Sequence, residues 1–310
     1  MEVMESVVPL SPEVFSIFCC PYCQGDLKQA TGTWECSRCA VIFPTRSGVP
    51  DFRLTKSVQR SLTFEVGGDR PDPSSFHYTY PMSKATDAWI AEEHWKRLLR
   101  PQATLLSYIP PPKGPRTFAL DLGCGSAKDR AFIESLGFIY VGCDPYDTRA
   151  PILADGHALP FKCDSFTVVF GLTVMEHFQN PFVCTAEVRR VLEVGGRFIG
   201  TVEQLVPFHM DSFYNMTKFG TYNVLAQSGL QPIAISPSSG WTGIVAHYSG
   251  SYWRGMPSWV RQGVAHSQDG VSILLWKLWS LLRHRPISNL ESEWMLKFAG
   301  GFKFVAERIS

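Results

Sequence analysis

The stretch Phe118-Ala-Leu-Asp-Leu-Gly-Cys-Gly-Ser-Ala127 decides the fold of this chain. Its apolar first half predicts a short buried strand that ends at Asp121. Gly123 and Gly125 let the backbone turn sharply and approach a ligand closely. Residues 127–136 can then begin a helix whose free N–H groups face the turn. The stretch therefore predicts a nucleotide-type cofactor site at the first strand–helix turn of an α/β sheet.

Short apolar runs alternate with helical segments after this turn, which predicts a doubly wound α/β fold with a parallel sheet. An earlier helix is expected at 84–108, before a proline-rich stop. The expected strands are 117–121, 138–143, 166–171, 196–202, 231–236 and 302–308, and the expected helices between them are 127–136, 181–192 and 217–228.

The composition describes an ordinary globular protein. The chain has 310 residues, of which 45% are hydrophobic and 18% charged, and this excludes a disordered chain. A net charge of +1 argues against a strongly basic nucleic-acid binder. The N-terminus lacks the pattern of a signal peptide, and no apolar run reaches the length of a spanning helix. We therefore expect a cytoplasmic protein.

Four of the nine cysteines form two CxxC pairs. Cys20 and Cys23 make the first pair, and Cys36 and Cys39 the second. Four thiolates at this spacing predict a closed, structural Zn²⁺ site. The surrounding Cys-Pro-x-Cys-x-Gly, Phe-Pro and Gly-Val-Pro-Asp-Phe elements resemble the zinc ribbon of the tRNA-methyltransferase activator family. Similar ribbons are fused to some rRNA guanine methyltransferases.

The chain is expected to divide into four parts. These are an N-terminal lead at 1–14, the zinc ribbon at 15–54, a linker at 55–83 and the cofactor-binding domain at 84–310, which includes a helical insert at about 250–290.

Further acidic residues accompany the glycine turn. Asp144 ends the next strand, about 20 positions after Gly125, where a carboxylate can hold a ribose diol. Asp155-Gly156 places a second carboxylate near the third strand. A dinucleotide dehydrogenase would need glycine at position 128, where this chain has Lys128.

Several motifs together resemble class I SAM-dependent methyltransferases, most closely the type 11 group. They are Asp-Leu-Gly-Cys-Gly, Val-Gly-Cys-Asp-Pro, Ala-Asp-Gly-His-Ala-Leu-Pro-Phe, Met-Glu-His-Phe-x-Asn-Pro-Phe and Val-Leu-Glu-Val-Gly-Gly-Arg-Phe, within residues 116–230. The resemblance implies a seven-stranded Rossmann-like sheet and S-adenosyl-L-methionine (SAM) as cofactor. One position departs from the family pattern, because Ala127 stands where glycine is usual.

The resemblance also implies residue roles. Asp121, Gly123 and Gly125 would cradle the methionine part of SAM, Asp144 would hold the ribose, and Asp155 and Gly156 would address the adenine. Further cofactor contacts are expected from Cys124, Pro145 and Leu172.

The methyl acceptor is less defined by the sequence. His177 follows the fourth strand and titrates near neutral pH, so it can act as a base toward a hydroxyl group. His209 lies beyond the fifth strand, in a Pro-Phe-His segment that resembles an element of type 11 enzymes, and it is a second candidate. Glu203 is a third polar candidate that can equally be structural.

The C-terminal insert is aromatic-rich, and Val271–Arg283 is expected to form one helix. It can be a lid, an oligomer contact, or an interfacial helix that docks on lipid. We expect an enzyme that methylates a small-molecule or lipid-like acceptor, at a hydroxyl oxygen. The alternatives are an rRNA or tRNA base methyltransferase that grips RNA through its ribbon, and a SAM-binding partner protein without turnover.

Overall fold

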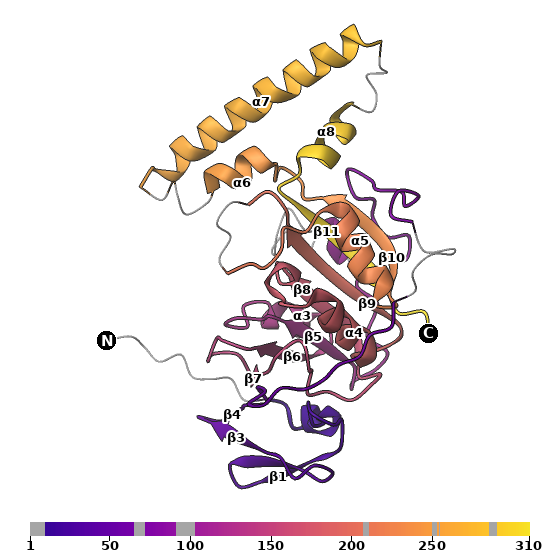
Figure 1. The fold of residues 1–310 in the computed structure, drawn as a ribbon, viewed down its shortest axis with the longest axis vertical. Coiled ribbons are helices and arrows are strands. Elements are labelled where there is room, and N and C mark those ends of the chain that lie inside the picture. The colour runs from indigo at the N-terminus through magenta and orange to yellow at the C-terminus, as the bar shows by residue number, and fades with distance from the viewer. Residues whose placement is uncertain are drawn as a thin grey trace.

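Two β-sheets and a helical insert make up the chain (Figure 1). The computed structural model describes residues 10–64, 72–90, 103–206, 211–249, 253, 255–284 and 290–310. The small sheet lies at one end of the molecule, the large sheet in the middle, and the helical insert at the other end.

The large sheet has seven strands in the order β10-β11-β9-β8-β5-β6-β7. The neighbours from β9 to β7 are parallel, whereas β11 is antiparallel to both β9 and β10. The strands are β5 (Phe118–Leu122), β6 (Ile139–Asp144), β7 (Ile152–Leu153), β8 (Phe166–Leu172), β9 (Leu192–Glu203), β10 (Gln231–Pro237) and β11 (Gly301–Glu307).

The predicted α/β fold class is confirmed, but the sheet is mixed and not fully parallel as expected. β11 enters the gap between β9 and β10 from the opposite end of the sheet. A strand buried on both faces has a continuous apolar run whichever way it points. The residue pattern therefore does not show whether the strand is parallel or antiparallel to its neighbours.

Both faces of the sheet are buried. Leu120 and Val169 point to one face, and Ala119 and Val168 to the other, as the two-residue period of a strand requires. The helices associated with this sheet are α2 (Ala103–Leu106), α3 (Arg130–Ser135), α4 (Pro181–Val191) and α5 (Lys218–Gln227). Residues 84–90 form turns and not the expected start of a helix, and 91–102 lie outside the described residues.

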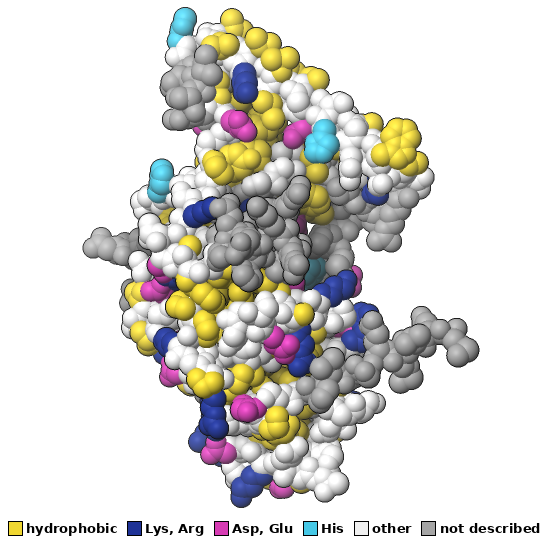
Figure 2. All heavy atoms as spheres, turned by 180° about the vertical axis from the view of Figure 1, so that it is seen from behind, with side chains coloured by type: hydrophobic (Ala, Val, Ile, Leu, Met, Phe, Trp, Pro, Cys, Tyr) yellow, Lys and Arg dark blue, Asp and Glu magenta, His cyan; other side chains and the backbone are white. Residues whose placement is uncertain are grey.

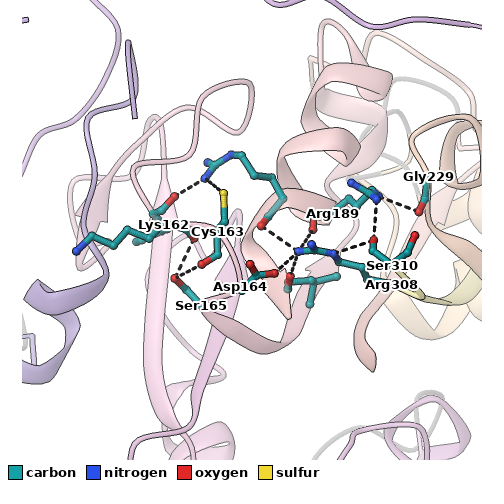
Figure 3. A network of polar contacts seen from close by, with 11 residues as sticks. Lys162, Cys163, Asp164, Ser165, Arg189, Gly229, Arg308 and Ser310 are labelled. Atoms are coloured by element: carbon teal, nitrogen blue, oxygen red, sulfur yellow. Dashed lines mark hydrogen bonds and ion pairs between the residues drawn. The ribbon is translucent and has the colours of Figure 1, made fainter. Parts of the chain in front are cut away.

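Helix α4 is closed at both ends by side chains. Pro181 begins it, and the Asn180 side chain accepts a hydrogen bond from the Val183 N–H at 3.2 Å. At the other end, Arg308 Nη1 donates to the carbonyl oxygens of Arg189, at 3.2 Å, and of Leu192 (Figure 3). The C-terminal residues of the chain therefore cap the carbonyl end of α4.

The small sheet belongs to the predicted ribbon. The ribbon begins with the short helix η1 (Pro12–Ile17). Its strands are β1 (Leu27–Ala30), β2 (Thr33–Cys36), β3 (Ile42–Arg46) and β4 (Val49–Pro50), and each is antiparallel to the next. Phe18 packs edge-on against Phe52, and it also contacts Phe161 of the large domain. The Phe52 N–H donates to the Leu153 carbonyl of β7 at 2.8 Å. The ribbon thus extends the core and the sheet edge beside β7.

The helical insert lies between β10 and β11, as expected, and is longer than 250–290. It consists of α6 (Gly243–Ser249), α7 (Ser258–Leu282) and α8 (Leu290–Phe298). Helix α7 begins 13 residues before the predicted start at Val271, which makes it 25 residues long. None of the described helices combines the length and the apolar content that crossing a bilayer requires.

Candidate functional site

The glycine turn follows β5 and closes tightly against β6 and β8. Gly123 and Gly125 have φ angles of +73° and +50°, in the left-handed region that favours glycine. The N–H groups of Gly123 and Cys124 both donate to the Cys143 carbonyl, at 2.9 and 3.2 Å. A Cβ atom on Gly123 would lie 2.5 Å from Cγ2 of Val174, so no larger residue fits there.

Ala127 is the strained member of this turn. Its φ angle is +58°, although its Cβ atom makes the left-handed region costly by about 1 kcal/mol. The departure from the family pattern therefore falls at a position where the backbone itself favours glycine. Such strain persists because the surrounding contacts hold the turn.

Asp144 ties the turn to the end of β6. Its Oδ2 accepts a hydrogen bond from the Gly125 N–H at 3.2 Å. Its Oδ1 accepts from the N–H groups of Tyr146 and Asp147, both at 2.8 Å. One carboxylate thus fixes two neighbouring loops at the carboxyl edge of the sheet, where ligands bind in open α/β sheets.

The ribbon reaches the same edge through Arg53. Its guanidinium makes two hydrogen bonds to Asp51, at 2.8 and 2.7 Å, and Nη1 donates to the Pro145 carbonyl at 3.4 Å. The pairing with Arg53 lowers the pKa of Asp51 despite the opposing effect of burial. The loop after Asp144 is therefore supported by a residue that lies 92 positions earlier in the chain.

Asp121 is a buried carboxyl group, only 4% exposed. Burial raises its pKa to about 7, although the Tyr140 hydroxyl opposes this by donating to Oδ2 at 2.8 Å. A buried carboxylate favours a nearby positive charge. The site therefore fits a ligand that brings a cationic group to the glycine turn.

Asp155 and Gly156 lie in the loop after β7. Asp155 Oδ1 accepts from Nδ1 of His157 at 2.6 Å, and Nε2 of His157 faces the Asn180 N–H at 3.0 Å. Burial raises the pKa of Asp155, but the hydrogen bonds from His157 outweigh it and the net shift is downward. This chain of contacts fastens the loop to the start of α4.

Leu172 is the last residue of β8, and a strained turn follows it. Thr173 has a φ angle of +56°, which is rare for a β-branched residue. Its N–H donates to the carbonyl of Thr201 at 3.0 Å, and the two threonine hydroxyls are 3.1 Å apart. The turn leads into the short helix η2 (Met175–His177).

Two glutamates lie where β8 and β9 end: Glu176 follows β8 and is buried, and Glu203 is the half-buried last residue of β9. Burial, with a smaller contribution from the neighbouring Glu203, raises the pKa of Glu176 to about 8. Burial also raises the pKa of Glu203 to about 7, although the Trp241 indole opposes this shift by donating a hydrogen bond to Oε2 at 2.7 Å. Both carboxyl groups can therefore exchange a proton near neutral pH.

A loop covers this glutamate pair. The N–H groups of Phe213 and Tyr214 donate to the Glu176 carbonyl oxygen at 2.8 and 3.2 Å, and the Met216 N–H donates to that of Glu203 at 2.9 Å. Phe213 and Tyr214 are nevertheless 59% and 44% exposed. The loop thus presents aromatic surface next to two titratable groups.

The two predicted histidine bases have different outcomes. His177 ends η2, directly after Glu176, and is half-buried. His209 lies outside the described residues. The remaining predicted cofactor residues gather at the carboxyl ends of β5 to β8, which places Asp121, Gly123, Cys124, Gly125, Asp144, Pro145, Asp155, Gly156 and Leu172 along one edge of the sheet.

The structure brings the four ribbon cysteines together, with all four Sγ atoms within 4.8 Å of one another. The Cys20–Cys39 and Cys23–Cys36 Sγ distances are 3.6 and 3.4 Å. A tetrahedral Zn²⁺ with Zn–S bonds of about 2.3 Å requires S···S distances of about 3.8 Å. A Cβ atom on Gly25 would lie 2.8 Å from Cβ of Arg38 and 3.3 Å from Cys23 Sγ, so the turn needs glycine.

Three residues of the site were missed, or undervalued, by sequence reasoning. Arg53 carries no local signal, because its contact depends on the docking of the ribbon. Glu176 appears in the sequence only as part of a motif, although its apolar predecessors Val174 and Met175 hint at burial. Trp241 was not singled out, since its partner Glu203 lies 38 positions away.

The fold and this edge define a Rossmann-like domain with a cofactor turn. The family model described as "Methyltransferase domain" matches residues 120–200. This part of the chain is therefore a methyltransferase domain, and the protein is a SAM-dependent methyltransferase. No curated protein sequence matches the chain.

Many solved structures are similar to the chain. The complex of the Haloferax volcanii Trm112 methyltransferase activator with a putative methyltransferase has 18% identity and a TM-score of 0.43, covering 71% of this chain and 92% of the other. A putative methyltransferase from Bacillus halodurans has 11% identity and a TM-score of 0.45, with coverages of 67% and 98%.

A geranyl diphosphate C-methyltransferase from Streptomyces coelicolor, in complex with Mg²⁺, geranyl diphosphate and S-adenosyl-L-homocysteine, has 15% identity and a TM-score of 0.42, with coverages of 76% and 90%. All three TM-scores lie below 0.5, so these structures carry no inference about the substrate of this chain.

Proposed function

We propose that the protein transfers a methyl group from SAM to a hydroxyl oxygen of a small apolar or lipid-like acceptor. When bound, SAM supplies an electrophilic methyl group on a sulfonium centre. The protein has to align donor and acceptor, exclude water and take up the proton of the hydroxyl group.

The cofactor roles proposed here follow the geometry of the sheet edge. Asp121 offers a buried carboxylate to the ammonium group of the methionine part, beside the turn at Gly123 and Gly125. Asp144 holds the ribose hydroxyls from the end of β6. The loop after β7 addresses the adenine through Asp155. Contacts from Cys124, Pro145, Gly156 and Leu172 complete the proposed cofactor site.

One observation supports a hydroxyl acceptor above all: two neighbouring carboxyl groups, with pKa values of about 7 for Glu203 and about 8 for Glu176, lie at the ends of β9 and β8. A general base works best when its pKa lies near the working pH. Glu203, the more acidic of the two, is the proposed base. Glu176 remains protonated beside it, and His177 is the alternative base.

Exposed apolar side chains support an apolar acceptor. Leu205 follows the proposed base by two residues and is 42% exposed, and Phe219, the second residue of α5, is 45% exposed. Phe213 and Tyr214, whose N–H groups donate to the Glu176 carbonyl oxygen, add further exposed aromatic surface. Such clustered exposure typically marks a binding surface.

The ribbon is proposed to hold one structural Zn²⁺ through Cys20, Cys23, Cys36 and Cys39. A closed set of four thiolates leaves no position for a substrate. The metal would instead stabilise the ribbon, whose residues Asp51 and Arg53 support the loop at Pro145.

The function is tested by incubating the protein with cell extracts and methyl-labelled SAM, followed by mass spectrometry of separated fractions. We expect the label in small apolar molecules or lipids, bound through oxygen, with a rate that rises with pH through about 7. Glu203→Gln should slow transfer by about 100-fold or more without loss of SAM binding. Glu193→Gln is the matched control, because Glu193 is a half-buried glutamate at the other end of β9.

Label in RNA bases would contradict the proposed acceptor and favour RNA methylation. Intact SAM binding with no labelled fraction would favour the partner protein without turnover. If the label is bound through oxygen but Glu203→Gln transfers methyl groups at the wild-type rate, the proposed acceptor class is supported and the assignment of Glu203 as the base is refuted.

A further inference from the structure

Helix α7 turns its apolar side away from the protein. Figure 2 shows hydrophobic side chains along the end of the molecule that carries the helical insert. In a surface helix of a globular protein the apolar stripe normally faces the core. The outward residues of α7 are 36% to 80% exposed, and they include Val264, Val271, Leu274, Leu275, Leu278 and Leu282.

The inward side of α7 carries polar groups. Ala265 and Ser280 are buried, and Asp269 and Trp276 are half-buried, at a spacing that places all four on one side of the helix. This side contacts α6 and α8. Among the residues that the structure describes, no packing covers the apolar side of α7.

Basic and aromatic side chains border the apolar side. Lys277 lies along one border, and Arg283 lies along the other with its guanidinium 4.9 Å from the Trp279 ring centre. Trp259 is 75% exposed. Asp269 is the only acidic residue within α7, and it belongs to the inward side. The outward surface is therefore apolar, with basic side chains at its borders and no acidic residue of α7 on it.

We propose that α7 docks on the surface of an anionic lipid bilayer. An apolar helix face with tryptophan, lysine and arginine at its borders binds in the interfacial region of a membrane. At about 1.5 Å per residue, its 25 residues extend for about 37 Å along that surface. The basic borders match the negative charge of anionic headgroups.

A second copy of the chain fits this face less well. A symmetric pair would bring the same surface of both copies together. The basic borders would then face each other, because α7 offers no outward acid to pair with them. Like charges in such a contact oppose association, which favours the lipid surface as the occupant.

Docking through α7 would also orient the proposed acceptor site. Helix α6 begins two residues after Trp241, whose indole holds Glu203. The insert therefore starts beside the glutamate pair. This consequence rests on the proposed lipid-like acceptor, whereas the docking itself is measured without any methyl transfer.

The test is sedimentation of the full-length protein with vesicles of phosphatidylcholine alone, or with about 30% phosphatidylserine. We expect binding to the anionic vesicles that weakens with salt. Leu275→Asp combined with Leu278→Asp should reduce binding by at least about tenfold, since it removes two apolar anchors. Ile42→Asp is the matched control, because Ile42 is 60% exposed on the ribbon.

A second readout does not depend on the folding of that variant. Brominated lipids in the anionic vesicles should quench part of the tryptophan emission of the wild-type protein. Trp259→Phe combined with Trp279→Phe should remove most of the quenched part. Absence of wild-type binding to anionic vesicles overturns the proposal. The proposal is also overturned if no vesicle binding is seen and the wild-type protein instead forms a dimer that the combined Leu275→Asp and Leu278→Asp variant dissociates.

Discussion

The buried carboxyl of Glu176 should make the stability of the protein fall as pH rises. Its pKa is raised from 4.5 to about 8 in the folded chain. Between these values the native state binds more protons than the unfolded chain, so the free energy of unfolding decreases with increasing pH. One pKa unit corresponds to about 1.4 kcal/mol. The ionised carboxylate therefore lowers the free energy of unfolding by on the order of 5 kcal/mol above pH 9.

Glu176→Gln removes this dependence, because glutamine keeps the shape of the protonated side chain and does not ionise. We expect its free energy of unfolding to stay within about 1 kcal/mol of the wild type at pH 5 and to exceed it by about 3 kcal/mol or more at pH 9. Urea unfolding followed by tryptophan fluorescence measures both. The exposed Glu35 provides the control variant Glu35→Gln.

Parallel stability curves for the wild type and Glu176→Gln between pH 5 and pH 9 would show that the Glu176 carboxyl does not titrate with a raised pKa in the folded protein. The double variant with Glu203→Gln should flatten the curve further, because the pKa of Glu203 is also raised by burial.

Three other predictions concern the cofactor edge and the ribbon. Arg53→Ala removes the contact to the Pro145 carbonyl and should weaken SAM binding several-fold by calorimetry, whereas Lys28→Ala, on exposed β1, should not. Ala127→Gly should leave stability unchanged or raise it by up to about 1 kcal/mol, and Ala127→Val should lower it; destabilisation by glycine would contradict the strain at φ +58°. Metal analysis should find about one Zn²⁺ per chain, lost in Cys23→Ser, and a metal-free wild type would refute the site.

The glycine turn could be predicted because its determinants are local. Asp121, Gly123 and Gly125 lie within five consecutive residues, and their backbone conformation follows from residue type. The two CxxC pairs are similar, since each turn brings its own two thiolates to one point. Sequence motifs therefore reveal those parts of the site that short stretches of chain build by themselves.

Other features depend on contacts between distant segments. The antiparallel direction of β11 follows from where the chain re-enters the sheet, and its apolar pattern does not encode this. The contact of Arg53 with Pro145 requires the docked ribbon. For α7, the residue pattern identifies an apolar stripe, but only the position of α6 and α8 shows that this stripe faces outward.

Calorimetry with S-adenosyl-L-homocysteine measures whether the turn after β5 binds SAM. The wild type should bind one molecule per chain. Asp144→Ala should weaken binding by at least about tenfold, because it removes the carboxylate proposed to hold the ribose and frees the Gly125 N–H. Ile42→Asp should bind normally. Absence of heat with the wild-type protein at high ligand concentration, or unchanged affinity in Asp144→Ala, would contradict the account.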